Sequence, residues 1–399
     1  MKIALLTQYY KPEMGAPQNR LYEMVTGLKK LGNDLIVITG MPNYPAGKIF
    51  EEYKGKFSCK DNLDDVPVYR YWLYATNTKK TLQRIWNMVS FSMTSFFSLK
   101  YLRKFKPDYI IVESPPLTLC LTAWLLSKCC GARLITNISD LWPLSARELG
   151  AISGDSYAYK CLEKIEKFIY KKSSVCLGQS SEIVDYMSEH GAKKTYLFRN
   201  GVDPSRFEGL VSNHNCNEPF KIVYAGLLGY AQGIFDICKN IDFYKMGVEF
   251  HIYGAGGEQV DIEQYLSDNS GKGIIYHGKV TREQIPQVLI DSDVALIPLV
   301  VNIYGAVPSK IYEAMAAGLP ILFSGEGEGQ RIIEKYNLGW VAPAKDYKMM
   351  TENIKSFMQD PNQVQKKKEN CIRCAKEVFN RPKQIAGLNE CLENNLMSK

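Results

Sequence analysis

The sequence predicts an α/β protein of two domains, each with a doubly wound parallel sheet. First, 399 residues are more than one ordinary hydrophobic core accommodates. Second, short runs rich in β-branched residues alternate with helix-length amphipathic segments almost from end to end, which is typical of βαβ units. Third, this alternation stops in the stretch 200–219, rich in Gly, Pro, Asn and Asp, and then begins again.

Each half contributes its own set of predicted strands. In the first half they are KIALLT (2–7), DLIVIT (34–39), PDYIIVE (107–113), ARLITNI (132–138) and SSVCLG (173–178). In the second half they are KIVYAG (221–226), VEFHIYG (248–254), GIIYHG (273–278), DVALIPL (293–299) and LPILFSG (319–325). Helices are expected at 17–31, 79–105 and 156–172, and the last forty residues are predicted to be helical. We therefore predict domains at 1–200 and 220–380, a linker at 201–219 and a C-terminal helix at 381–399 that packs back on the first domain.

Composition excludes several classes of protein. Hydrophobic residues make up 46% and charged residues 23%, which is typical of a folded globular protein and not of a disordered one. The eleven cysteines are scattered, and Cys371 and Cys374 have no second pair at zinc-ligand spacing, so we expect free thiols in a reducing compartment. The apolar core of the opening MKIALLTQYYKPE is too short for a signal peptide, and the apolar run 117–126 is too short to span a bilayer. We therefore expect a cytoplasmic protein that does not bind nucleic acid.

In open α/β sheets, ligands bind beyond the carboxyl ends of the strands, so the segments that follow strands are the candidate ligand-binding segments. The first strand leads into QYYKPEMGAPQNR, where Gly15 precedes a helix begun by Pro17. Backbone N–H groups there could face an anion, with Glu13 beside them. An ordinary strand-to-helix turn explains the same residues.

A second segment of this kind is NISDLWPLSARELG, in which Asp140 and Trp142 directly follow a strand. A carboxylate at that edge is well placed to orient sugar hydroxyl groups. Alternatively, Asp140 caps the next helix and Trp142 is a buried anchor.

Two glycine-rich turns lie at the corresponding edge of the second domain. YAGLLGYAQG carries Gly226, Gly229 and Gly233, and YGAGGE carries Gly254, with spacings that permit close approach of the backbone to a pyrophosphate. The spacing matches neither the dinucleotide-binding nor the P-loop pattern. Each turn alone is weak evidence.

The stretch YGAVPSKIYEAMAAGLP, residues 304–320, is the most specific. A helix beginning after Pro308 would offer Ser309, Lys310 and its first amides to a diphosphate. Glu313, three residues after Lys310, is placed to accept hydrogen bonds from two ribose hydroxyls. The alternative is a surface helix with an ordinary Lys–Glu pair.

These motifs together resemble the family 4 retaining glycosyltransferases of GT-B fold, and within them the WbuB-like branch that includes bacterial fucosamine transferases. The resemblance covers nearly the whole chain. The matching stretches are YYKPEMGAPQNRLYEM, TGMPNYPAGKI, ESPPL, DLWPLSA, FRNGVD, YAGLLGYAQG and PSKIYEAMAAGLP.

The resemblance implies two domains facing across a cleft, and a role for each of them. The donor nucleotide would be bound by a set of residues in these motifs: Arg199, Gly226, Gly229, Gly254, Pro308, Ser309, Lys310 and Glu313. The acceptor would be bound near Glu13, Gly15, Asn43, Asp140 and Trp142. Asp140, Lys310 and Glu13 are the candidate catalytic residues. A donor phosphate oxygen would assist deprotonation of the acceptor, so neither a protein nucleophile, a cofactor nor a divalent metal is expected.

The sequence departs from the family pattern at a few positions. Gly305 stands where many members carry a second Glu, and Leu227 and Gln232 stand where an Arg and a Lys are common. Ser139 stands where the branch tends to show an Arg before Asp140, and Leu144 stands where it tends to show a Glu after Pro143. These differences bear on acceptor choice and on activity.

Charge is unequal between the halves: residues 1–200 hold 28 Lys and Arg against 18 Asp and Glu, and the remainder 21 against 24. Within the basic half, the stretch 77–106 combines basic ends with Phe91, Phe96 and Phe97. Such a helix is typical of the membrane interface, although a core-facing helix explains it too. The residues expected to face the membrane are Lys79, Lys80, Arg84, Trp86, Arg103 and Lys104.

The sequence and the resemblance therefore predict a retaining transferase, peripheral on the inner face of the cytoplasmic membrane. It would move a deoxy amino sugar such as N-acetylfucosamine from a UDP-sugar to a lipid-linked glycan acceptor in capsule or O-antigen assembly. Two alternatives are a catalytically weak partner subunit and a nucleotide-sugar epimerase.

Overall fold

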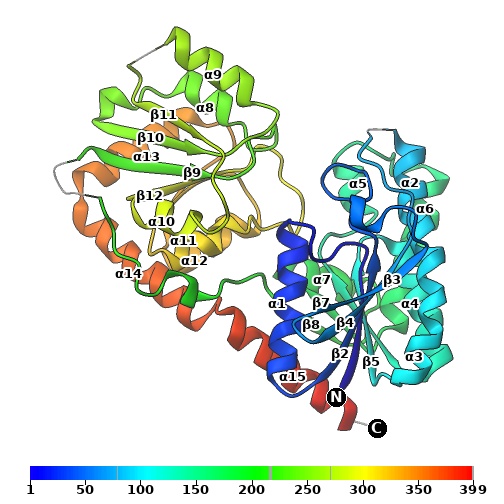
Figure 1. Ribbon diagram of the computed structural model, residues 1–399. Coiled ribbons are helices and arrows are strands. Elements are labelled where there is room, and N and C mark those ends of the chain that lie inside the picture. The colour runs from blue at the N-terminus through cyan, green and yellow to red at the C-terminus, as the bar shows by residue number, and fades with distance from the viewer. Residues whose placement is uncertain (79, 215–217, 270, 398–399) are drawn as a thin grey trace. The chain divides into compact units, whose positions relative to one another are not determined.

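The computed structural model describes residues 1–78, 80–214, 218–269 and 271–397, which form two compact units (Figure 1). The first unit comprises residues 1–199 and the C-terminal segment from Pro382 onward, and the second comprises residues 200–381. Each is an α/β domain with a largely parallel sheet, which confirms the predicted fold class. In the described part of the chain, no helix is both long and apolar enough to cross a membrane.

The first unit contains an eight-stranded sheet with the order β3–β4–β2–β1–β5–β6–β7–β8. Strand β3 pairs with β4 antiparallel, and the other neighbouring strands pair in parallel. The strands are β1 (Lys2–Leu6), β2 (Asp34–Gly40), β3 (Ser58–Leu63), β4 (Val66–Tyr71), β5 (Tyr109–Ser114), β6 (Arg133–Ile138), β7 (Val175–Gly178) and β8 (Thr195–Leu197).

Helices cover both faces of this sheet. They are α1 (Ala16–Lys30), α2 (Thr81–Thr94), α3 (Leu99–Phe105), α4 (Leu117–Cys130), α5 (Leu144–Glu148), α6 (Tyr157–Lys172), α7 (Ser181–Glu189) and α15 (Arg381–Met397), with short 3-10 turns η1 (Glu51–Tyr53) and η2 (Ser95–Ser98). Successive side chains of β1 point to opposite faces of the sheet, so each face packs against a separate layer of helices. Ile3 and Leu5 pack with α1 and α15, whereas Ala4 and Leu6 pack with α4.

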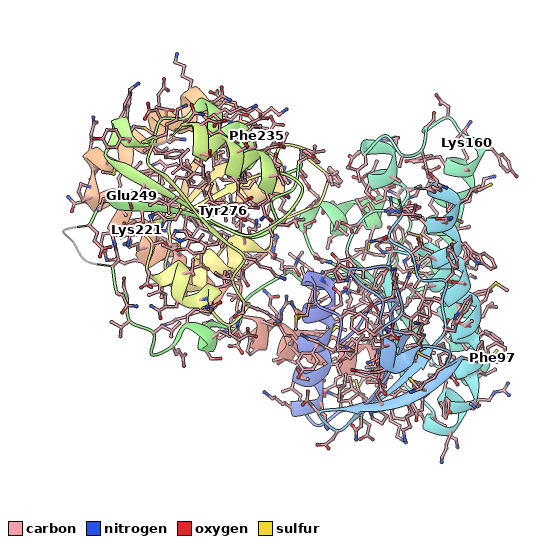
Figure 2. All side chains as sticks on the ribbon, turned by 45° about the horizontal axis from the view of Figure 1, so that its top comes forward. Phe97, Lys160, Lys221, Phe235, Glu249 and Tyr276 are labelled. Atoms are coloured by element: carbon pink, nitrogen blue, oxygen red, sulfur yellow. The ribbon has the colours of Figure 1, made fainter. Side chains whose placement is uncertain are left out.

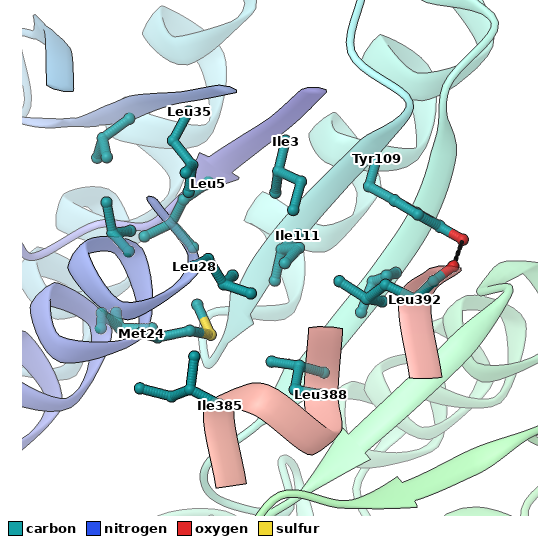
Figure 3. Close-up of a cluster of buried hydrophobic side chains, with 14 of the residues drawn as sticks. Ile3, Leu5, Met24, Leu28, Leu35, Tyr109, Ile111, Ile385, Leu388 and Leu392 are labelled. Atoms are coloured by element: carbon teal, nitrogen blue, oxygen red, sulfur yellow. Dashed lines mark hydrogen bonds between the residues drawn. The ribbon is translucent and has the colours of Figure 1, made fainter. Parts of the chain in front are cut away.

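The C-terminal helix α15 completes the first core, as predicted (Figure 3). Ile385, Leu388 and Leu392 are buried against β1, β5 and α1. The Tyr109 hydroxyl donates to the carbonyl of Leu392 at 2.8 Å, so this buried polar group has a partner. A side chain at Gly27 of α1 would lie 2.7 Å from Ile385, so the glycine permits the close contact of the two helices.

The second unit contains a six-stranded parallel sheet with the order β11–β10–β9–β12–β13–β14. Its strands are β9 (Phe220–Ala225), β10 (Val248–Tyr253), β11 (Ile274–Gly278), β12 (Val294–Pro298), β13 (Ile321–Ser324) and β14 (Gly339–Ala342). Its helices are α8 (Ile234–Asn240), α9 (Gln259–Asp268), α10 (Ile285–Ile290), α11 (Lys310–Ala316), α12 (Glu328–Tyr336), α13 (Tyr347–Gln359) and α14 (Pro361–Glu377), with η3 (Pro204–Phe207) and η4 (Tyr244–Met246). All ten strands predicted from the sequence are present in the two sheets.

The segment 79–105 is not the single helix that we predicted. It forms α2, η2 and α3 in succession, and Lys79 lies outside the described residues. The hydroxyl groups of Ser92, Thr94 and Ser95 donate to carbonyls three or four residues earlier. Such bonds compete with the helical pattern, which explains the 3-10 turn.

Residues of the predicted linker contribute to the second unit. Val202 and Phe207 are buried in its core, and Val202 forms an isolated bridge with Asn380. The polar composition of 201–219 predicted only a linker and did not indicate that these two apolar side chains are buried.

Candidate functional site

Parallel pairing brings the carboxyl ends of β1, β2, β5 and β6 to one edge of the first sheet, so the segments that follow them are neighbours. Glu13 follows β1 and Asn43 follows β2. The Glu13 carboxylate accepts hydrogen bonds from the backbone N–H groups of Asn43 and Tyr44, both at 2.8 Å, and of Tyr10 at 3.1 Å. The side chain is 1% exposed. Glu13 thus joins the two loops at this edge.

Burial dominates the titration of Glu13. Loss of water raises the pKa of its carboxyl group from 4.5 to about 7, against the three backbone donors and the Arg70 guanidinium, which lower it. Arg70 also donates to the carbonyl of Lys11 in the same loop and pairs with Asp61 of β3. The hairpin β3–β4, which the sequence analysis missed, therefore supports the Glu13 loop.

Gly15 is the N-cap residue of α1, which begins at Ala16, one residue before the predicted start. No side chain caps this terminus. A Cβ atom at Gly15 would lie 2.4 Å from the amide oxygen of Gln18, which is buried. A larger residue at position 15 would therefore collide with Gln18, so packing is one reason for glycine here.

A buried polar cluster lies at the ends of β5 and β6, and the sequence analysis did not identify it. Arg20 of α1 forms an ion pair with Glu113 of β5 and donates to the hydroxyl of Ser139. Ser139 and Asn137 also donate to the Glu113 carboxylate. Burial raises the pKa of Glu113, and Arg20 opposes the shift. The sequence signal was weak, because Arg20 and Glu113 are 93 residues apart.

Asp140 follows this cluster directly. Its carboxyl group reaches solvent, but the surrounding protein removes part of its water and raises its pKa, while Arg20 lowers it. The next helix, α5, has Pro143 as its N-cap residue without a side-chain cap, so Asp140 is not the capping residue that one interpretation suggested. Trp142 is half-buried, and Leu144 packs in a core cluster with Ile138 and Leu141.

In the second unit, the two glycine-rich turns pack against each other at the carboxyl ends of β9 and β10. Gly226 and Gly254 have φ of 152° and 150°, and a Cβ atom at Gly254 would lie 1.8 Å from the carbonyl oxygen of Gly226. The N–H of Gly226 donates to Tyr253 at 2.8 Å, so this amide is already engaged. Gly229 lies farther along, beside Gln232.

Lys310 reaches this pair of turns from α11. Its Nζ donates to the Tyr224 hydroxyl at 2.6 Å and lies 3.8 Å from the centre of the Tyr224 ring. A Cβ atom at Gly226 would lie 2.4 Å from Nζ, so the ammonium group lies directly over the first turn. Loss of water lowers the pKa of Lys310 from 10.5 to about 7, and Glu313 opposes the shift.

The other predicted donor residues are more dispersed. Glu313 pairs with Arg206 of η3 at 3.5 Å, a partner that the sequence analysis missed. Ser309 is the exposed N-cap residue of α11, and Pro308 precedes it. Arg199 belongs to the first unit, where it donates to the Ser181 hydroxyl at 2.7 Å. Within the described ranges, no three His, Cys, Asp or Glu side chains gather as metal ligands would.

Two family models match successive parts of the chain. The glycosyl transferase 4-like domain matches residues 15–201, and the glycosyl transferases group 1 domain matches residues 211–378. The putative colanic acid biosynthesis glycosyl transferase WcaI of Escherichia coli K12 is 27% identical over 335 residues, 80% of this chain and 82% of WcaI. The probable glycosyltransferase WbjE of Pseudomonas aeruginosa is 26% identical over 63% of this chain and 66% of WbjE.

Solved structures share the fold. Sucrose-phosphate synthase from Thermosynechococcus elongatus aligns over the whole of both chains with a TM-score of 0.76 and 15% identity. HepE from Anabaena, solved in complex with UDP, aligns with a TM-score of 0.72 and 14% identity over 99% of this chain and all of HepE. These likenesses identify the fold class as GT-B, as expected from the sequence.

We expect Glu13→Gln to flatten the dependence of stability on pH. A carboxyl group whose pKa rises from 4.5 to about 7 on folding binds more protons in the folded state, so stability falls as pH rises between these values. The contribution is about 3 kcal/mol. Thermal unfolding of wild type and variant across this range measures it. Parallel curves would show that burial does not control the titration of Glu13.

We expect Gly254→Ala to destabilise the second unit by about 2 kcal/mol or more, because the new methyl group overlaps the Gly226 carbonyl. Gly229→Ala is the matched control, since the nearest atom there is the flexible tip of Gln232. Denaturant unfolding of both variants provides the comparison. Equal losses of stability would contradict the packing of one turn on the other.

Proposed function

We propose that this chain, which carries a glycosyltransferase 4-like domain and a glycosyl transferases group 1 domain, transfers a sugar from a UDP-sugar to a lipid-linked acceptor. The observation that carries the proposal is the position of Lys310. Its ammonium group lies over the paired glycine turns at the carboxyl edge of a parallel sheet, and Glu313 lies one helical turn farther on. Nucleotide phosphates bind at such edges.

On this proposal, each donor residue has a separate task. Lys310 neutralises charge that develops on the leaving diphosphate, which is the largest contribution that a site without a nucleophile can make. The Glu313 carboxylate accepts hydrogen bonds from the ribose hydroxyls and is oriented by Arg206. The acceptor oxygen bonds to the anomeric carbon from the face that the departing diphosphate leaves, and a phosphate oxygen of that diphosphate takes the acceptor proton, so the anomeric configuration is retained. HepE, a protein of the same fold, was solved with UDP, which supports a uridine nucleotide.

The first unit would bind the acceptor through Asp140. Burial raises the pKa of its carboxyl group, and the charge of the Arg20 guanidinium opposes this shift and favours the carboxylate, which accepts hydrogen bonds from sugar hydroxyls. Glu13 would act by holding the loops of Gly15 and Asn43 in place. Two relatives, WcaI of Escherichia coli and AmsK of Erwinia amylovora, are named for colanic acid and amylovoran biosynthesis, which supports a role in a bacterial surface polysaccharide. A deoxy amino sugar such as N-acetylfucosamine is the proposed transferred unit.

We further propose that the first unit binds the inner face of the cytoplasmic membrane. Trp86, Phe96 and Phe97 are exposed on α2 and η2, and Phe97 is visible at the surface in Figure 2. The centres of the Phe97 and Phe57 rings lie 5.4 Å apart, so the exposed Phe57, which directly precedes β3, extends the apolar surface. Phe91, grouped with these aromatics from the sequence, is instead buried in the core. Lys80, Arg84, Arg103 and Lys104 provide the positive charges.

Calorimetric titration with UDP, GDP, ADP and CMP tests the donor site. Selective binding of UDP is the expected result, and preference for GDP would assign a different class of donor. Failure of all four nucleotides to bind would favour a catalytically weak partner subunit. Gly305, Leu227 and Gln232, which replace charged residues common in the family, are consistent with that alternative. Release of epimerised sugar without an acceptor would favour an epimerase.

Glu313→Ala is expected to weaken UDP binding roughly tenfold, because two ribose hydroxyls lose a charged acceptor. Glu352→Ala on α13 removes an exposed carboxylate from the same unit and is expected to leave affinity unchanged. The same titration measures both. Equal affinities for wild type and Glu313→Ala would remove Glu313 from the donor site.

Reversing the charges of Arg103 and Lys104 to Glu is expected to lower affinity for phosphatidylglycerol vesicles at least roughly tenfold, because each basic residue near an anionic surface contributes about 1 kcal/mol. Lys193 and Lys194 lie near β8, at the edge of the sheet opposite β3, so their reversal to Glu is the control. Cosedimentation measures binding. Equal loss in both variants would indicate nonspecific attraction of a basic protein.

A further inference from the structure

Lys310 and Tyr224 form a contact that the proposed donor chemistry does not require. Lys310 lies at the start of α11 and Tyr224 at the end of β9, 86 residues earlier. The ammonium group donates to the Tyr224 hydroxyl at 2.6 Å and lies 3.8 Å from the ring centre. Tyr224 itself is buried, and its hydroxyl donates onward to the carbonyl of Leu227. The tyrosine therefore holds the lysine over the Gly226 turn.

The contact lies where the family pattern places other cations. Leu227 and Gln232 occupy the positions at which the family that this chain resembles commonly carries Arg and Lys. The Leu227 side chain is 66% exposed and carries no charge. Lys310 approaches the same turn from α11, so a basic group lies over the turn although the loop itself carries none.

The charged groups around Lys310 leave it without a close anionic partner among those that the structure describes. Glu313, on its own helix, favours the charged form but pairs with Arg206 at 3.5 Å. Glu258, from the turn before α9, faces Tyr224 and accepts hydrogen bonds from the N–H groups of Ile234 and Phe235. A lysine held against an aromatic ring by a neutral hydroxyl loses hydrating water and gains no opposite charge in return. This arrangement disfavours the protonated ammonium form relative to the neutral amine.

We propose that Tyr224 is a positioning residue that holds Lys310 as a neutral amine in the free protein, and that a bound nucleoside diphosphate takes over Nζ with uptake of one proton from solvent. The inference rests on the proposed donor site. The new N–H bond forms at the amine lone pair, the proton comes from the buffer, and the resulting ammonium binds the phosphate oxygens. Nothing is oxidised or reduced.

The direction of the titration agrees with this proposal. Burial lowers the pKa of Lys310 to about 7, and an adjacent diphosphate raises it again. Proton uptake is therefore expected above about pH 7 and declines below it, where Lys310 is already charged.

The test measures protons taken up when UDP binds the full-length protein at about pH 8, from calorimetric titrations in HEPES and in Tris, two buffers of different ionisation enthalpy. Close to one proton per UDP is expected for wild type, and none for uridine, which has no phosphate. Lys310→Arg, whose guanidinium stays charged, should bind UDP without uptake. Lys335→Met on α12 removes an exposed lysine and should leave uptake unchanged.

Tyr224→Phe separates positioning from simple support of the fold. The ring remains but the hydroxyl that holds Nζ is lost, so Lys310 should turn to solvent, regain its charge and reduce uptake by more than half. Unchanged uptake in Tyr224→Phe would overturn the role of Tyr224. UDP binding without uptake in wild type would overturn the whole inference and leave the donor site intact, whereas absence of UDP binding would overturn the donor site itself.

Discussion

The constraint on which both units depend is the parallel register of their strands. Parallel pairing brings every strand-to-helix segment to one edge of a sheet, so residues far apart in the chain become neighbours there. Glu13 and Asn43 meet because β1 and β2 pair in register from Lys2 with Asp34 to Leu6 with Ile38. Gly226 and Gly254 meet because β9 and β10 pair up to Ala225 and Tyr253. A slip of one residue in either pair would separate these contacts and turn the strand side chains to the wrong face.

Burial of charge at these edges is costly, and the structure meets the cost in different ways. Glu13 receives three backbone donors, and Glu113 receives a guanidinium, a hydroxyl and an amide. Both carboxyl groups nevertheless keep raised pKa values, because the donors do not fully replace water. Lys310 has the sparsest surroundings of the three, with a neutral hydroxyl and a ring. Groups held in this way respond most strongly to an incoming ligand of opposite charge.

The sequence was sufficient for the elements whose pattern is local. All ten predicted strands are present, because short runs of β-branched residues can be recognised without knowledge of the partner strand. The hairpin β3–β4 was missed because SCKDNL, at the sheet edge, alternates between exposed and half-buried residues, and because VPVYRY carries a Pro. The break at Ser95–Ser98 was missed because it depends on hydroxyl bonds to nearby carbonyls, one of them to Trp72 of a neighbouring segment.

The sequence was sufficient to predict which segments contribute to the candidate site, but not which side chains pair with one another there. Segments after strands identified Glu13, Asp140 and the glycine turns, but not Arg20 with Glu113 or Arg206 with Glu313, because those pairs join distant parts of the chain. The first of these pairs also changes how one departure from the family pattern is interpreted. Position 139 is a serine, yet the Arg20 guanidinium bonds that serine and acts on Asp140.

Positions 227 and 232 likewise carry no charge, yet Lys310 covers the same turn from α11. In both units a basic side chain absent from the loop is supplied by a helix. A helix places its side chains more rigidly than an exposed loop does, so the position of the basic group is fixed before any ligand binds.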